Sequence, residues 1–106
     1  MLKIKNKLGK TALIMAITHD RTETAKILIN NGTNVNAVDF QGETALIIAS
    51  RFGNYDIVKT LSDNGADVIV ISKYGLSGLS SARRENYTDI VNLLIASGVT
   101  ENGGVI

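Results

Sequence analysis

The chain has 106 residues, of which 44% are hydrophobic and 20% are charged, and its formal net charge is +1. This length fits one domain, and the near-zero charge argues against both a disordered tail and a strongly basic nucleic-acid binder. The absence of cysteine excludes disulfides, thiolate metal sites and cysteine nucleophiles, and the single histidine, His19, argues against a zinc site.

The chain repeats itself with a period of 33 residues. Glycines recur at this interval in two phases, as Gly9, Gly42 and Gly75 and as Gly32, Gly65 and Gly98. Residues 6–38 placed over residues 39–71 give 11 identities in 33 positions, and residues 39–65 placed over residues 72–98 give nine more. Three tandem units of one design therefore fill the chain.

Each unit predicts a first helix that follows a turn. A hydroxyl residue suited to capping a helix start precedes the apolar residues, as Thr11, Thr44 or Ser77. A small alanine recurs in mid-helix, as Ala16, Ala49 or Ala82, which favours close helix packing. The expected first helices run over 12–19, 45–52 and 78–85.

A second helix follows a short break in every unit. Its apolar residues recur at spacings of three and four, as Val58 and Leu61 do, and this spacing is helical. Thr22 and Thr88 are expected to cap this helix in units one and three. The glycine at 32, 65 or 98 is expected to stop it in the left-handed conformation. An extended link, over 35–38 or 68–71, then leads to the next turn.

Helices of about ten residues are marginal alone in water, so each pair must bury its apolar faces against the neighbouring pair. Stacking of successive pairs supplies this partner.

These features resemble the ankyrin repeat family. The motifs that carry the resemblance are the 33-residue period, the Gly-x-Thr-x-Leu start, the mid-helix alanine, the second-helix segments DIVKTL and DIVNLL, and NGADV at 64–68. The resemblance implies one all-α domain over 1–106, a solenoid of stacked helix-turn-helix pairs with short hairpin-like links. Its repeats would be about 6–38, 39–71 and 72–104, with 1–5 as the remnant of a preceding link.

The chain departs from the family pattern at the start of the first helix. The family usually has Thr-Pro-Leu-His there, whereas this chain has no proline, and Ile14, Ile47 and Ser80 replace the histidine. We therefore expect lower stability than that of a consensus array, partly offset by burial of the two isoleucines.

The two ends of the array are predicted to differ. Polar residues in the first helix of the third unit favour a C-terminal cap, because terminal repeats need a polar outer face. These residues are Ser80, Ser81, Arg83 and Arg84. The first unit keeps Ile14, Met15 and Ile17, so its outer face is expected to be partly open. The chain is expected to be a monomer, with self-association through that face as the alternative.

The resemblance also implies a surface for a protein partner, because ankyrin-like folds bind through hairpin tips and the concave face of the first helices. The tip candidates are Lys7, Leu8, Lys10, Phe40, Gln41, Glu43, Lys73, Tyr74 and Leu76. The candidates on the first helices are His19, Arg51, Phe52 and Arg84.

Three of the five aromatic residues, Phe40, Phe52 and Tyr74, fall on this candidate face. Aromatic residues and arginine are enriched among residues that dominate interface energy. The alternative is that Phe40 and Phe52 fill the gap between hairpin and helix. A basic rim at the tips would favour an acidic partner, although lysines also prevent edge pairing of exposed extended segments.

Other functions find little support in the sequence. No phosphate-binding or calcium-binding motif occurs, and no sequence feature identifies a catalytic nucleophile beside His19. No apolar run reaches the ~20 residues that span a bilayer. We therefore expect no catalysis, no cofactor, no metal, no nucleic acid and no membrane contact. The leading interpretation is a cytoplasmic protein-interaction module. The alternatives are a secreted effector and a fragment of a larger protein whose other domain the repeats position.

Overall fold

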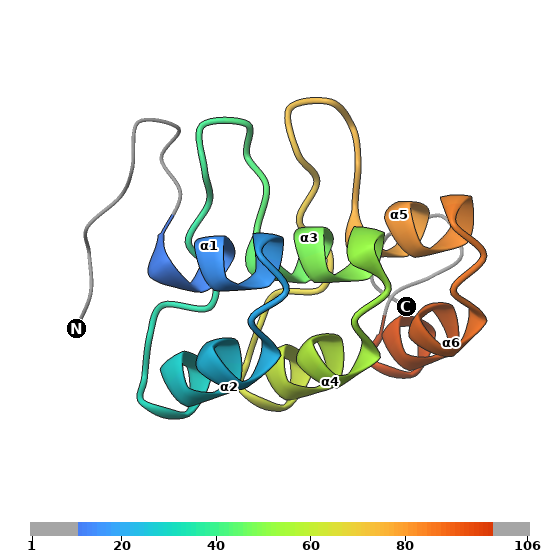
Figure 1. The fold of residues 1–106 in the computed structure, drawn as a ribbon. Helices are drawn as coiled ribbons and strands as arrows, with labels where there is room; N and C mark the ends of the chain where they lie inside the picture. The colour runs from blue at the N-terminus through green and yellow to red at the C-terminus, as the bar shows by residue number, and fades with distance from the viewer. Residues whose placement is uncertain (1–10, 99–106) are drawn as a thin grey trace.

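A computed structural model describes residues 11–98 of the chain, and within them it contains six helices and no strand (Figure 1). The helices are α1 (Ala12–Thr18), α2 (Thr22–Asn30), α3 (Ala45–Phe52), α4 (Tyr55–Asp63), α5 (Gly78–Arg84) and α6 (Thr88–Ala96). The predicted all-α class is confirmed. The proposed link remnant at 1–5, the tip residues Lys7, Leu8 and Lys10, and the segment 99–106 lie outside the described residues.

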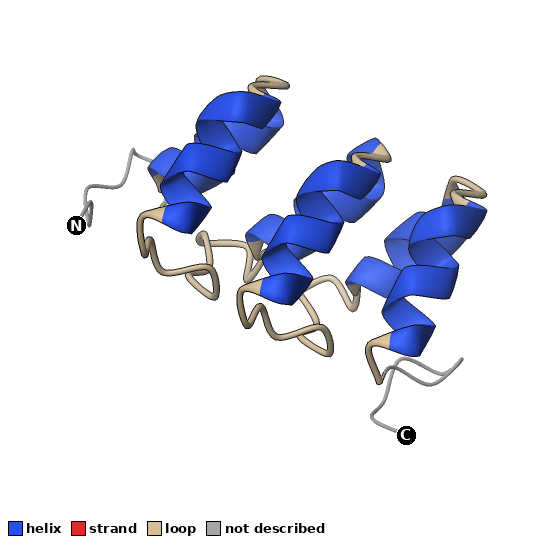
Figure 2. Cartoon of the chain, turned by 90° about the horizontal axis from the view of Figure 1, so that it is seen from below, coloured by secondary structure: helices blue, strands red, loops and turns tan. Residues whose placement is uncertain are grey.

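The helices form two layers that advance one pair at a time along the chain. In Figure 1, α1, α3 and α5 lie in one row and α2, α4 and α6 in the row below. Contacts join α1 to α3 and α3 to α5 in the first layer, and α2 to α4 and α4 to α6 in the second. Figure 2 shows the same three pairs side by side from below. This is the stacking that short amphipathic helices need in order to leave water.

Hydroxyl caps start the three first-layer helices, as predicted. The side-chain oxygens of Thr11 and Thr44 each accept a hydrogen bond from the backbone nitrogen three residues later, at 3.3 Å. Ser77 accepts the equivalent bond at 3.1 Å and adds a reciprocal bond from its own backbone nitrogen to the Ser80 hydroxyl. These bonds satisfy N–H groups that have no partner inside a helix.

The prediction that Thr22 and Thr88 cap the second helices is wrong. Both residues are already helical, and the residues before them, Arg21 and Tyr87, make no side-chain cap bond. Among the second-layer helices, α4 alone has a side-chain cap, where Asn54 accepts from the backbone nitrogen of Ile57 at 3.2 Å. Thr22 instead accepts a hydrogen bond from the Asn54 side chain at 2.9 Å, so it ties repeat one to repeat two.

Two turn positions beside the helices of each repeat have left-handed backbone. Gly32, Gly65 and Gly98 follow the second-layer helices with φ values of 85°, 86° and 106°, as predicted. The turn inside each pair holds Asp20, Gly53 and Asn86, again 33 residues apart, with φ values of 58°, 74° and 61°. A residue with a Cβ is strained in this conformation, so repeats one and three carry a strain that repeat two avoids.

The core extends through the whole stack. The fully buried side chains belong to both layers and include Leu13, Leu46, Leu79, Ile57 and Leu61. These five residues belong to one cluster, which joins the three pairs into one hydrophobic unit. Its largest share lies around α3, which has neighbours on both sides.

Successive positions on the first-layer helices face opposite ends of the stack. Ile14 and Ile47 are buried, as predicted, whereas Ser80, their counterpart at the end of the stack, is exposed. The prediction that Ile14 and Ile17 lie on an open outer face of the first unit is wrong, because both are buried. At the next position the exposed residue is in repeat one instead: Met15 is partly exposed, while Ile48 and Ser81 are buried. The prediction that Ser81 belongs to the polar outer face is therefore wrong. Its position points back toward repeat two, and Ser80 takes the outer role.

Candidate functional site

Two hairpin tips project from the first layer on one side of the molecule (Figure 1). We call them fingers and define them as residues 39–43 and 72–76. The backbone nitrogen of Asp39 donates to the carbonyl of Glu43 at 3.1 Å, and that of Ser72 donates to Leu76 at 2.9 Å, which closes each finger at its base. Gly42 and Gly75 turn the chain inside the tips with φ values of 75° and 76°.

A buried polar side chain shapes each finger from within. The Asp39 Oδ1 atom accepts hydrogen bonds from the backbone nitrogens of Gln41 at 2.9 Å and Glu43 at 3.0 Å. The Ser72 hydroxyl does the same for Tyr74 at 3.2 Å and Leu76 at 3.3 Å. Aspartate and serine favour such turns because their short side chains can replace a backbone acceptor. These internal bonds therefore hold each finger in shape.

The two fingers and their links are also bonded to each other. The Lys73 backbone nitrogen donates to the Gln41 carbonyl at 2.9 Å, so the fingers lie side by side at their tips. Below them, Asn36 donates to the Gly65 carbonyl at 3.4 Å and accepts from the Asp67 backbone nitrogen at 2.7 Å. These bonds give the projecting segments a fixed spacing.

Glu43 and Arg51 form an ion pair at the base of the first finger. Arg51 donates from Nη1 to Oε2 at 2.6 Å and from Nη2 to Oε1 at 3.2 Å, and the Glu43 side chain is only 6% exposed. Glu43 is therefore a tip candidate whose carboxylate does not face solvent. Paired bonds of this kind fix both side chains in orientation as well as in distance.

The hydrogen bonds to Glu43 raise the pKa of Arg51 above its ordinary value, although burial opposes the shift. A raised pKa means that this contribution to stability is complete at every pH below the ordinary arginine pKa. It is lost only as the pH rises through the folded-state value in strongly alkaline solution. Titration of Arg51 therefore leaves the base of the finger unchanged across the physiological range.

The three candidate aromatics are exposed. Phe40 is 63% exposed, Tyr74 69% and Phe52 48%, so the alternative in which Phe40 and Phe52 fill the space between hairpin and helix does not describe them. The Arg51 guanidinium lies 5.7 Å from the centroid of the Phe52 ring. Phe52 is thus held beside the same arginine that anchors the first finger.

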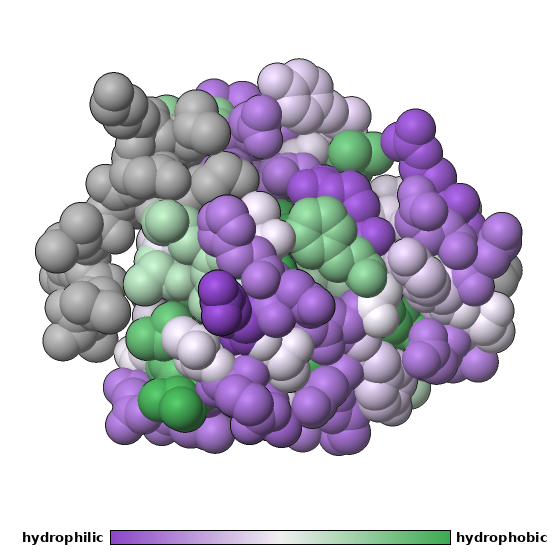
Figure 3. All heavy atoms as spheres, in the orientation of Figure 1, coloured by the Kyte–Doolittle hydropathy of each residue, from purple (hydrophilic) through white to green (hydrophobic). Residues whose placement is uncertain are grey.

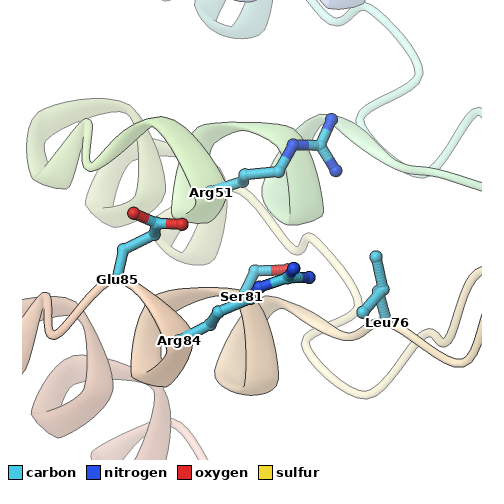
Figure 4. Close-up of a pocket in the computed structure, with 5 residues that line it drawn as sticks. All are labelled: Arg51, Leu76, Ser81, Arg84 and Glu85. Atoms are coloured by element: carbon cyan, nitrogen blue, oxygen red, sulfur yellow. The ribbon is translucent and has the colours of Figure 1, made fainter.

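A hollow of about 290 Å³ opens between α3 and α5 below the second finger. We call it the α3–α5 hollow, and it is lined by Arg51, Leu76, Ser81, Arg84 and Glu85 (Figure 4). It brings together Arg51, Leu76 and Arg84 from the candidate set. His19 lies apart from it, exposed beside a second, apolar hollow that Ala12, Met15 and Ala16 also line.

The surface around these features is mixed. Figure 3 shows mostly hydrophilic side chains on the face seen in Figure 1, with apolar side chains between them. Gln41, Lys73 and Arg84 are exposed, while Leu76 is half-buried. An apolar anchor surrounded by polar groups is the usual composition of a protein-binding surface.

The described residues contain neither a cluster of candidate metal ligands nor a helix that could span a membrane. Within 11–98, no group of three or more histidine, aspartate or glutamate side chains could hold a metal ion. None of the helices in this part of the chain has the length and apolar character needed to cross a membrane.

Comparison with known proteins agrees with the architecture. The family model described as ankyrin repeats (3 copies) matches residues 2–72, which is more than half of the chain. No curated protein matches the chain.

Proposed function

The chain belongs to the ankyrin repeat family, whose repeats are generally protein–protein interaction modules and typically non-catalytic, and from this premise we propose that it binds a protein partner through its fingers and first-layer helix ends. Phe40, Phe52 and Tyr74 act as the apolar anchors. Arg84, Gln41 and Lys73 surround them with polar groups.

The exposure of the three aromatic side chains carries this proposal. Each is about half exposed or more, although each costs free energy in contact with water. Aromatic side chains supply large contact area and lose little rotamer entropy on binding, so they often dominate interfaces. Phe40 and Tyr74 lie on fingers that internal hydrogen bonds hold in place, which lowers the entropy lost on association.

The experiment compares the double variant Phe40→Ala/Phe52→Ala with the unchanged chain. Both proteins are immobilised, exposed to a lysate of the source organism, and compared by quantitative mass spectrometry. We expect the main retained protein to fall by about tenfold or more with the double variant, because loss of one anchor costs about 1–2 kcal/mol or more. Circular dichroism should show unchanged helix content, because both rings lie outside the core.

Tyr55→Ala is the matched control. Tyr55 is also a partly exposed aromatic residue, but it starts α4 in the second layer, away from the fingers. The control should retain the same protein as the unchanged chain. Full retention by a folded double variant would remove Phe40 and Phe52 from the binding surface.

A further inference from the structure

The α3–α5 hollow contains a buried hydroxyl group with no partner. Ser81 is 3% exposed, and its Oγ makes no hydrogen bond within the described part of the chain. Most buried polar side-chain atoms in proteins are hydrogen-bonded, because burial without a partner costs the group its bonds to water. The Ser81 hydroxyl thus marks this hollow as a place where a polar group from outside can complete a hydrogen bond.

The charges around the hollow are separated along its length. Both arginine side chains extend toward the end where Leu76 lies, and Glu85 lies at the opposite end (Figure 4). Arg51 already donates two N–H groups to the Glu43 carboxylate. Arg84 is exposed and forms no ion pair with any carboxylate among residues 11–98. The finger end of the hollow is therefore rich in hydrogen-bond donors.

We propose, resting on the proposed function, that the α3–α5 hollow binds one carboxylate side chain of an acidic segment in the partner protein. Arg84 donates two N–H groups to the carboxylate, since a guanidinium matches its geometry. The Ser81 hydroxyl donates to the same group and thereby gains its missing bond. Arg51, whose charge is paired with Glu43, offers a remaining N–H group from the opposite wall.

The half-buried Leu76 at the finger end favours an apolar residue beside the acid. The hollow is too mixed in character for an apolar side chain alone. A neutral amide would lose the charge-assisted part of the interaction with Arg84, which is the stronger part.

The test uses the full chain labelled with ¹⁵N and two blocked tripeptides, N-acetyl-Leu-Glu-Leu-amide and N-acetyl-Leu-Gln-Leu-amide. Backbone resonances of Ser81 and Arg84 are followed at fixed ionic strength. We expect saturable shifts with the glutamate peptide and binding about tenfold weaker with the glutamine peptide, as a charge-assisted hydrogen bond requires.

Two variants of neighbouring arginines form the matched pair. Arg84→Gln should weaken binding of the glutamate peptide by about tenfold. Arg83→Gln removes the same charge from the adjacent exposed residue, which does not line the hollow, and should change binding by less than about twofold. Ser81→Ala should weaken binding by about threefold without lowering stability, because it also removes the unsatisfied hydroxyl.

Equal binding of the two peptides, no shift at Ser81 and Arg84, or equal losses for Arg83→Gln and Arg84→Gln would overturn the carboxylate site. These results are distinguishable from failure of the proposed function. The peptides probe the hollow alone, whereas the lysate comparison depends on Phe40 and Phe52.

Discussion

Replacing Leu46 with alanine is expected to lower the free energy of unfolding by about 3 kcal/mol, the largest effect of any single change considered. Leu46 lies in the middle of the stack and is 1% exposed. A Cβ built on Gly78 would lie 2.6 Å from the Leu46 Cδ2 atom, which shows how closely this side chain approaches α5. Truncation removes apolar burial and leaves a cavity between repeats two and three.

Urea unfolding followed by circular dichroism measures this loss. Ile27→Ala is the control, because it shortens an aliphatic side chain on α2 that is 61% exposed. That change should cost no more than about 0.5 kcal/mol. A Leu46→Ala variant as stable as the Ile27→Ala variant would contradict the packing described at the α3–α5 interface.

Replacing Gly53 with alanine is expected to cost about 2–3 kcal/mol, the second largest effect. Two causes add. The residue has a φ of 74°, and alanine is strained there by about 1–2 kcal/mol. A Cβ at this position would also lie 2.7 to 2.9 Å from three atoms of the Tyr87 ring. Tyr87 packs against the glycine from the next repeat, so the ring must move.

Chemical denaturation of a double-variant cycle with Tyr87→Ala separates the two causes. In the absence of the ring, Gly53→Ala should cost only the backbone strain, about 1–2 kcal/mol. Asn86→Gly is the matched control, because it makes the reverse change at the corresponding turn of repeat three, where φ is 61°. That variant should gain up to about 1 kcal/mol. Identical costs of Gly53→Ala with and without Tyr87 would show that ring and glycine are not in contact.

Much of the fold could be predicted from local features of the sequence. The period, the hydroxyl caps and the stop glycines depend on residues within a few positions of each other, and each has one physical role. The caps of the second helices failed because Thr22 and Thr88 lie one position inside the helix, and spacing alone cannot distinguish the two positions. The prediction for Ser81 is wrong because a serine in a polar segment can still face the neighbouring repeat, as Ser81 does.

Less of the candidate site than of the fold could be predicted from the sequence. Glu43 and Arg51 are eight residues apart on two different segments, and nothing in the pattern pairs them. The role of Asp39 and Ser72 did have a signal, since Asn6, Asp39 and Ser72 recur every 33 residues and all three types favour such turns. Asn6 itself lies outside the described residues. The identity of a partner depends on complementary chemistry that one chain does not contain.

The translational stacking of the helix pairs is the claim on which the candidate surface depends, and nuclear Overhauser effects in the full chain test it most directly. The account predicts strong effects between the Gly78 Hα atoms and a Leu46 methyl group, and between the Gly53 Hα atoms and the Tyr87 ring. Both contacts join one repeat to the next. Absence of these effects, together with contacts between α1 and α5 or between α2 and α6 as in a closed bundle, would contradict the stacking.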